Sequence, residues 1–269
     1  MKWTKELKTY LIENYEDKSN DVIDDISVLF GVRITPEQLY TKAINLKLKV
    51  SKERKRESYA VKKRKYNYPN YSIFENIKNI EVGYIMGLFW ADGYLNDISL
   101  SIEMVRDDFE VILPIFESLG EWDISIRKRK NRKEQMALKC HDYNIRKVFQ
   151  NFGYRTKSIN SPTFITNDIN SEITKSFLLG WFDGDGCLYS NPKQSQVYFC
   201  GTYDQDWSFI ENILDRLNIK YMIKKKIQKN GKYSVIYIGG KDNIKNFLNW
   251  LYSTPIKGLN RKYNKYLQM

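Results

Sequence analysis

Histidine, cysteine and long apolar runs are scarce in this chain of 269 residues. The single histidine, His141, argues against a histidine-based triad and against a multi-histidine metal site. The three cysteines are too few and too scattered for a disulfide framework or a zinc site. They favour a reducing compartment, so we expect a cytoplasmic protein of a bacterial or phage-infected cell, with an organelle as the alternative.

Membrane insertion and secretion are also disfavoured. The longest apolar stretch, residues 85–91, stops at Asp92, which is too short to cross a bilayer. The N-terminal residues open directly into a polar helical pattern, which lacks the features of a secretory signal. We therefore expect no membrane partner.

Positive charge is what the chain has in excess. Lys and Arg number 44 against 32 Asp and Glu, for a net charge of +12 and a pI near 9.3. Half of the excess lies in residues 51–70, which are interleaved with three tyrosines and followed by Tyr71, and two more basic runs occupy 127–133 and 224–226. One run alone is as readily a solvated face, but three favour nucleic acid, because basic clusters release counterions from phosphates. The side chains expected to contact double-stranded DNA are Lys42, Arg54, Lys55, Arg56, Lys63, Arg64, Arg127, Arg129, Lys224 and Lys226.

Residues 1–50 have the pattern of three short helices, over about 5–15, 21–30 and from 36 onward. Apolar residues at spacings of three and four give each helix a buried stripe, which includes Leu29 in the second helix and Ile44 in the third. Thr35, Pro36 and Gln38 predict a capping box at the start of the third helix. Its outward face is polar and basic, so the module resembles a helix-turn-helix, with a plain packing domain as the alternative. Residues 51–71 are predicted to be a basic linker.

One apolar motif occurs twice. Residues 83–93 (GYIMGLFWADG) are echoed by residues 176–186 (SFLLGWFDGDG). In both copies, small residues lie four apart, Gly87 with Ala91 and Gly180 with Gly184, which allows two helices to approach closely. Each helix is expected to stop at its Asp-Gly pair, with the glycine in the left-handed conformation.

Pairing of these helices would bring Asp92 and Asp185 together at one end. Two carboxylates at helix C-termini repel each other, and a divalent cation such as Mg²⁺ relieves the repulsion. A cation held between carboxylates and phosphate can support hydrolysis of a phosphodiester. The alternative for each motif alone is a buried helix with an ordinary stop, but two copies in register favour the metal site.

The paired motifs resemble those of the LAGLIDADG homing endonuclease family in its single-chain form. The resemblance covers residues 72–269 and implies an α+β fold of two pseudo-symmetric αββαββα halves, about 72–160 and 161–269, whose strands form a saddle-shaped antiparallel sheet. It implies that Asp92 and Asp185 are catalytic acids and metal ligands. One departure is Trp90, which stands where many members have an earlier acid, whereas Asp183 keeps that acid in the second copy.

The same resemblance implies a basic residue near the end of the last strand of each half, close to the scissile phosphate. Lys139 fits in the first half and Lys241 is the nearest base in the second. In the first hairpin, apolar side chains alternate with Arg127, Arg129 and Lys139, which predicts one apolar and one basic face.

The resulting hypothesis is a monomeric, site-specific endonuclease of double-stranded DNA, dependent on Mg²⁺ or another divalent cation and without an obligate protein partner. Two alternatives keep the scaffold but not the cleavage: a catalytically silent DNA-binding regulator and an intron RNA-splicing maturase. A third is a structural adaptor for an acidic protein, which the regular sheet pattern disfavours.

Overall fold

The chain divides into two compact units, residues 1–65 and residues 66–269, in a computed structural model. The structure describes residues 3–18, 21–51, 55, 66–128, 133–190, 194–228 and 231–269. Five of the predicted DNA contacts therefore lie outside the described residues, namely Arg54, Arg56, Lys63, Arg64 and Arg129. Within the described part, no helix is long and apolar enough to span a membrane.

The smaller unit consists of α1 (Lys5–Lys18), α2 (Val22–Phe30) and α3 (Pro36–Asn45). The predicted capping box is confirmed: the Gln38 amide N–H donates to Thr35 Oγ1 (3.3 Å), and the Thr35 N–H donates to Gln38 Oε1 (3.1 Å). The core is a single narrow stripe made of Leu7, Leu11, Tyr15, Val22, Ile26, Ile34, Leu39 and Ala43. The prediction that Leu29 and Ile44 are buried is wrong, because they lie outside this stripe and are 61% and 56% exposed.

The larger unit contains the two predicted αββαββα halves, which confirms the α+β fold. After α5 (Ser72–Glu75), the first half contains α6 (Ile80–Asp92), β1 (Tyr94–Leu95), β2 (Leu100–Val105), α7 (Arg106–Glu117), β3 (Asp123–Arg127), β4 (Gln135–Cys140) and α8 (Tyr143–Asn151). The second half contains α9 (Glu172–Asp185), β5 (Gly186–Ser190), β6 (Ser195–Thr202), α10 (Ser208–Arg216), β7 (Tyr221–Gln228), β8 (Gly231–Gly239) and α11 (Lys241–Leu251), followed by α12 (Asn260–Leu267).

Each half builds one four-stranded antiparallel sheet with the same strand order. The orders are β1-β2-β4-β3 and β5-β6-β8-β7. Helix α7 packs against β2 and β4, and α11 packs against β6 and β8. One face of each sheet is thus covered by helices, and alternate side chains of every strand point away from that core.

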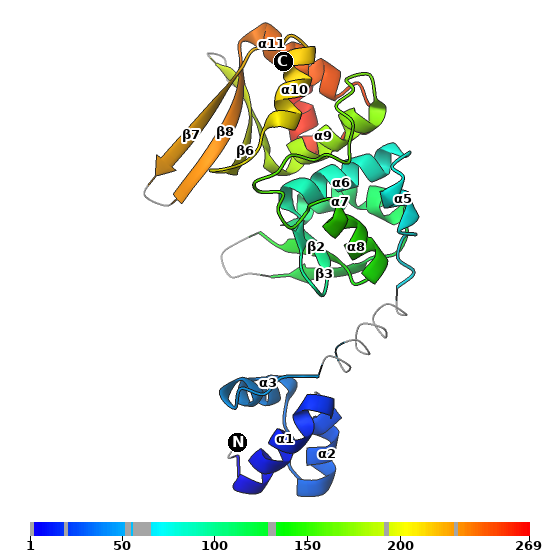
Figure 1. Cartoon of the computed structure of the whole chain (residues 1–269), viewed down its shortest axis with the longest axis vertical. Helices are drawn as coiled ribbons and strands as arrows, with labels where there is room; N and C mark the ends of the chain where they lie inside the picture. The colour runs from blue at the N-terminus through cyan, green and yellow to red at the C-terminus, as the bar shows by residue number, and fades with distance from the viewer. Residues whose placement is uncertain are drawn as a thin grey trace. The chain divides into compact units, whose positions relative to one another are not determined.

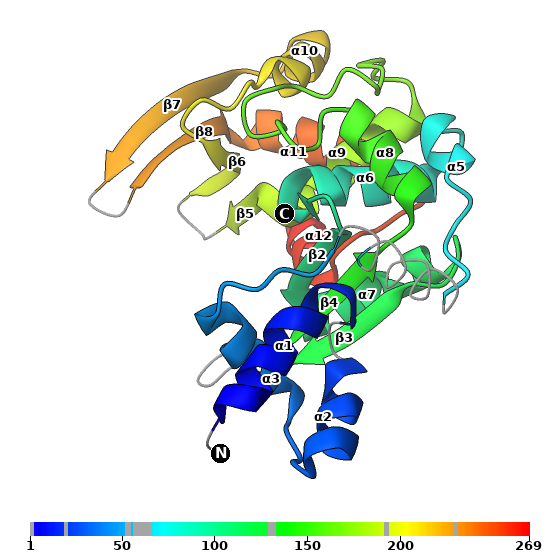
Figure 2. The same cartoon turned by 60° about the horizontal axis from the view of Figure 1, so that its bottom comes forward.

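Helices α6 and α9 lie side by side in the middle of the larger unit and join the two halves (Figures 1 and 2). Their small residues meet as the sequence predicted. A Cβ on Gly87 would overlap the Phe177 carbonyl oxygen, and a Cβ on Gly180 would overlap the Tyr84 carbonyl oxygen. The two backbones are in direct contact, so nothing larger than hydrogen fits at either position.

The glycines that end α6 and α9 differ from the prediction. Gly93 (φ −70°, ψ 149°) and Gly186 (φ −83°, ψ 153°) are extended rather than left-handed, because each leads straight into a strand region. A Cβ on Gly93 would overlap the Phe89 carbonyl, and a Cβ on Gly186 would overlap the Phe182 carbonyl and ring. Glycine is required here by close contact with the preceding helical turn, not by an unusual φ.

Residues 66–70, predicted to be linker, pack onto the larger unit. Tyr66 Oη donates to Asp123 Oδ1 (3.1 Å), and the Tyr68 ring lies 6.5 Å, centroid to centroid, from that of Trp122. The compact unit therefore begins at Tyr66.

Candidate functional site

Asp92 and Asp185 occupy the last positions of α6 and α9, at the same end of the helix pair. The Asp92 carboxylate lies against the Cα of Gly184, the neighbour of Asp185: a Cβ placed there would be 3.1 Å from Asp92 Oδ2. Burial raises the pKa of Asp185 to about 7, and the Asp92 charge adds to the rise. Desolvation also raises the pKa of Asp92, although solvent reaches its side chain. The structure thus brings the two predicted acids together.

A lysine that the sequence did not reveal lies beside this pair. Lys157, in the segment between α8 and α9, donates from Nζ to the carbonyl oxygens of Phe89 (3.0 Å) and Ala91. Burial lowers its pKa to about 8, while the charges of Asp185 and Asp92 act in the opposite direction. Its ammonium therefore neutralises both the carbonyl end of α6 and part of the aspartate charge.

A second lysine occupies the corresponding place at the end of α9. Lys262 of α12 is 2% exposed, and its Nζ donates to the carbonyl oxygens of Phe182, Asp183 (3.0 Å) and Gly186. Burial lowers its pKa to about 8, against the charge of Asp183. Lys157 and Lys262 come from segments of different length and follow no common spacing from the motifs, so sequence pattern could not identify them.

Asp183, the earlier acid of the second motif, is a buried structural group. Its Oδ2 accepts hydrogen bonds from Tyr84 Oη (2.8 Å) and from the Leu259 N–H (2.9 Å). Burial raises its pKa to about 6. At the matching place in the first motif, Trp90 packs edge-on against Tyr154 with ring centroids 5.0 Å apart. An apolar contact thus replaces the buried carboxylate in that half.

A cavity of about 440 Å³ opens next to Asp185. The residues that line it include Trp90, Lys157, Trp181, Asp185, Thr202 and Gln205. One carboxylate, one ammonium and one amide therefore face a shared space between α9 and the second sheet. Gln205 is fixed there by donation from Nε2 to the Lys157 carbonyl oxygen (3.0 Å).

The two lysines predicted to lie near the scissile phosphate are not joined to this site. Lys139 projects from the outward face of β4, in register with Ser101 and Asp123. Lys241 is exposed at the first position of α11. Among the described residues, neither lysine makes a hydrogen bond or an ion pair with Asp92 or Asp185.

The outward faces of the two sheets differ in charge. On the second sheet, Lys224 and Lys226 lie among tyrosines: Lys226 Nζ donates to Tyr237 Oη (2.7 Å), and Lys224 Nζ lies 5.5 Å from the same ring centroid. On the first sheet, Arg127 is paired with Glu103 (2.7 Å). The alternation predicted for the first hairpin holds only in part, because Ile126 is 49% exposed and Arg129 lies outside the described residues. Acidic neighbours from β2 and β3 offset the basic side chains that are described.

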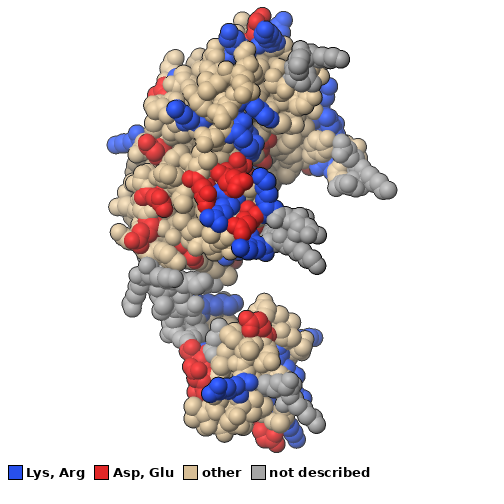
Figure 3. Space-filling view, turned by 180° about the vertical axis from the view of Figure 1, so that it is seen from behind, with Lys and Arg blue, Asp and Glu red and all other residues tan. Residues whose placement is uncertain are grey.

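Acidic and basic side chains are also interspersed on the rear face of the larger unit (Figure 3). Ion pairs of the larger unit include Arg106 with Glu110 (2.6 Å) and Lys128 with Glu134 (3.0 Å). Because opposite charges lie close together, the described part of the rear face shows no continuous positive surface. The uncompensated lysines of the second sheet are the stronger candidates for phosphate contacts.

The donor set at the helix ends fits a divalent cation. Asp92 and Asp185 supply carboxylate oxygens whose mutual repulsion a cation would relieve. Within the described residues, no cluster of three or more His, Cys, Asp or Glu side chains surrounds them. Such a site suits Mg²⁺, which retains waters and is bound through one or two carboxylates together with substrate phosphate.

Comparison with known proteins agrees with this architecture. Residues 81–159 match the WhiA LAGLIDADG-like domain family, and residues 172–251 match the LAGLIDADG-like domain family. An uncharacterized protein of Methanocaldococcus jannaschii is 26% identical over 184 residues, which cover 62% of this chain and 66% of that protein. The chain thus spans about two thirds of the length of this relative.

Solved structures with similar folds have low sequence identity to this chain. The homing endonuclease I-DmoI in complex with DNA and Ca is 14% identical, with a TM-score of 0.48, and the match covers 71% of this chain and 97% of that one. Full-length DUF199/WhiA from Thermatoga maritima is 17% identical, with a TM-score of 0.46, over 75% of this chain and 66% of that one. The duplicated motif, the two αββαββα halves and the two domain matches, which together span more than half of the sequence, establish that the chain belongs to the LAGLIDADG family.

Proposed function

We propose that this protein is a site-specific endonuclease of double-stranded DNA that works with Mg²⁺ or another divalent cation. The observation that carries the proposal is the meeting of Asp92 and Asp185 at the ends of two helices packed backbone to backbone. The cost of holding two carboxylates in this place is explained by a function that needs both.

The outward sheet faces are the proposed DNA surface. Lys224 and Lys226 on the second sheet would contact phosphates, and the tyrosines around them hold their side chains in place. Arg127 and Lys139 would serve the first half, together with Lys42 and Lys55 of the smaller unit. Lys241, at the start of α11, is a proposed phosphate contact only if the duplex extends beyond the sheet.

Asp92 and Asp185 would each serve one DNA strand. When bound, a divalent cation supplies a polarised phosphate and a water of lowered pKa. The two aspartates must be ionised to act as ligands, and Lys157 favours that state by its charge. Lys157 also lies on the wall of the cavity beside Asp185, where its ammonium can stabilise negative charge on an oxygen of the phosphate.

The test is cleavage of duplex DNA from the host locus with Mg²⁺, by the full chain and by Asp92→Asn and Asp185→Asn. We expect each substitution to lower double-strand cleavage by at least about 100-fold, as loss of a carboxylate that positions a cation does in metal-dependent sites. A nick in one strand that survives in each single variant would assign one acid to each strand.

Asp204→Asn is the matched control, because Asp204 is an exposed carboxylate of the same unit whose ion pair with Lys225 (3.4 Å) lies on the surface. It should cleave as the unmodified chain does. Cleavage that survives loss of both Asp92 and Asp185 would refute the site. Tight binding without cleavage by the unmodified chain would favour the regulator, and preference for structured intron RNA would favour the maturase.

A further inference from the structure

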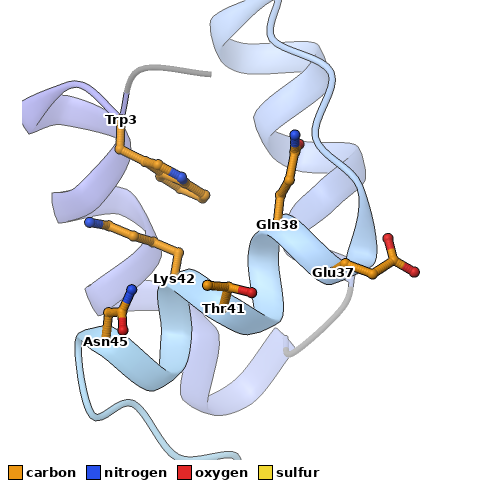
Figure 4. Close-up of a pocket in the computed structure, with 6 residues that line it drawn as sticks. All are labelled: Trp3, Glu37, Gln38, Thr41, Lys42 and Asn45. Atoms are coloured by element: carbon orange, nitrogen blue, oxygen red, sulfur yellow. The ribbon is translucent and has the colours of Figure 1, made fainter.

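The outward face of α3 in the smaller unit combines the side chains that recognise DNA bases. Gln38, Thr41, Lys42 and Asn45 have the i, i+3, i+4, i+7 spacing of one helical face, and Leu39 and Ala43 occupy the buried opposite face. With Trp3 and Glu37, they line a hollow of about 400 Å³. Figure 4 shows the Trp3 indole beside Lys42, with Glu37 pointing away from it.

Most hydrogen-bonding groups on this face are left available by the described part of the smaller unit. Among the described residues, Thr41 and Asn45 make no intramolecular hydrogen bond through their side chains. The side-chain oxygen of Gln38 accepts a hydrogen bond from the Thr35 N–H, and its side-chain amide donors stay available. Lys42 Nζ lies 5.9 Å from the centroid of the Trp3 ring, which holds the lysine against the helix without neutralising it.

The charge of the smaller unit is divided along the sequence. Residues 1–30 contain four basic and seven acidic side chains, whereas residues 31–51 contain four basic and one acidic. Within residues 1–51, the positive part is therefore α3 with its flanking turns, and the strongly basic residues 52–65 follow it directly in the sequence. A polyanion is favoured on the α3 side and is repelled from the acidic part of α1 and α2.

The local architecture also suits insertion of α3 into a groove. Gly31 ends α2 in the left-handed conformation (φ 65°), and five residues later the capped α3 begins. Helix, short turn and second helix form the arrangement in which a recognition helix enters the major groove. An asparagine on such a helix can donate to and accept from adenine, and a threonine methyl can contact thymine.

We propose that α3 reads base edges in the major groove of duplex DNA, with Thr41 and Asn45 as specificity-determining residues. Lys42, steadied by Trp3, contacts the adjoining phosphate or guanine. The expected sequence is rich in A·T pairs. This inference extends the proposed function by assigning a second DNA-reading element, and it does not require the chain to cleave.

The experiment is selection of a random-sequence duplex library by the full-length chain in EDTA, so that cleavage does not enter. Thr41→Ala/Asn45→Ala is compared with the unmodified chain and with Thr9→Ala. Thr9 is the matched control, because it is an exposed neutral polar residue on α1, away from α3. Alanine at all of these exposed helical positions preserves helix propensity, and circular dichroism verifies the fold.

We expect the unmodified chain and Thr9→Ala to select one shared site. It should contain an A·T-rich block of about three or four base pairs, the length one recognition helix can contact. Thr41→Ala/Asn45→Ala should lose selection within that block alone and bind the selected site about tenfold more weakly or worse, because each lost base contact removes discrimination of this order.

Two results would overturn the inference. One is a double variant that selects the same block with unchanged affinity. The other is structured RNA that displaces the selected duplex at equal concentration. Because the readout is base selection without metal, it remains informative whether or not Asp92→Asn and Asp185→Asn abolish cleavage.

Discussion

The two halves repeat one backbone plan but place different side chains on it. Lys157 and Lys262 each bind the carbonyl end of a motif helix, and Lys157 also lines the cavity beside Asp185. Lys262 is buried against α9 together with Asp183. The first half has Trp90 where the second has this acid. The two motif helices are therefore pseudo-symmetric, whereas the charges around them differ: Lys157 lies beside the proposed cation site, and Lys262 is buried with Asp183.

Asp183 provides a test of this division through the pH dependence of stability. Burial raises its folded-state pKa to about 6, from an ordinary value of 3.8. The folded state then binds more protons than the unfolded state between these values, so stability falls as pH rises through that window. The loss is about 3 kcal/mol by pH 7. Asp183→Asn cannot ionise, and its carboxamide oxygen can still accept from Tyr84 and Leu259.

We therefore expect Asp183→Asn to match the unmodified protein at pH 4 and to exceed it at pH 7. Urea unfolding of the full chain with a chelator present would measure the difference. Asp204→Asn, on the surface, should follow the unmodified protein at both pH values. Parallel pH dependence of Asp183→Asn and the unmodified chain would contradict the ionised, buried state of Asp183.

Residue types and spacing located part of the site. Asp92 and Asp185 are identifiable because each ends a copy of the same motif. Lys157 and Lys262 are not, because a lysine in a loop of a chain rich in lysine has no distinctive spacing. Lys139 and Lys241, which the family resemblance implies near the scissile phosphate, make no contact with the aspartates among the described residues, and their role there stays a prediction.

At the scale of helices and strands, contacts between elements determine backbone conformation and burial more than the propensities of single residues do. Apolar periodicity predicted the three helices of the smaller unit, and the family resemblance implied the order of helices and strands in the larger one. They could not predict that Gly93 and Gly186 are extended, since that follows from the turn of helix packed above them. They also overestimated the core of the smaller unit, because a three-helix bundle of this size buries only one stripe of each helix.

The contact between α6 and α9 predicts strong sensitivity at Gly87. A Cβ there would lie 2.7 Å from the Phe177 carbonyl carbon and 3.0 Å from the Trp181 nitrogen. Backbone atoms cannot move aside as a side chain can. We expect Gly87→Ala to destabilise the larger unit by about 3 kcal/mol, the upper end of overpacking costs, despite the better helix propensity of alanine.

Gly239→Ala is the control, because a Cβ at Gly239 meets nothing within 4 Å and its φ is ordinary. It should leave the unfolding midpoint in urea nearly unchanged. If Gly87→Ala costs no more than Gly239→Ala, the two helices do not touch through their backbones. The packing of α6 against α9, which brings Asp92 close to Asp185, would then also be contradicted.

At the scale of the whole molecule, the distribution of charge assigns each unit a different part in the proposed DNA binding. The described helices of the smaller unit, with residues up to 51, are close to neutral overall, and the basic excess of the first unit lies in residues 52–65. The larger unit supplies lysines on its second sheet, whereas others of its charges, such as Arg106 with Glu110, are paired with one another. We thus assign affinity for phosphates mainly to residues 52–65 and the second sheet, and selection of bases to α3.

Removal of residues 1–65 tests this assignment, and Tyr66 is the correct new start because residues 66–70 pack on the larger unit. Residues 52–65 contain eight basic side chains. If about half of them neutralise phosphates, the logarithmic slope of affinity against salt becomes less steep by about 3–4 in the truncated chain. Lys245→Gln, on the exposed side of α11, is the control and should change the slope by less than about 1. An unchanged slope on truncation would mean that the sheets hold the DNA alone, and the basic segment would then be a solvated connection between units.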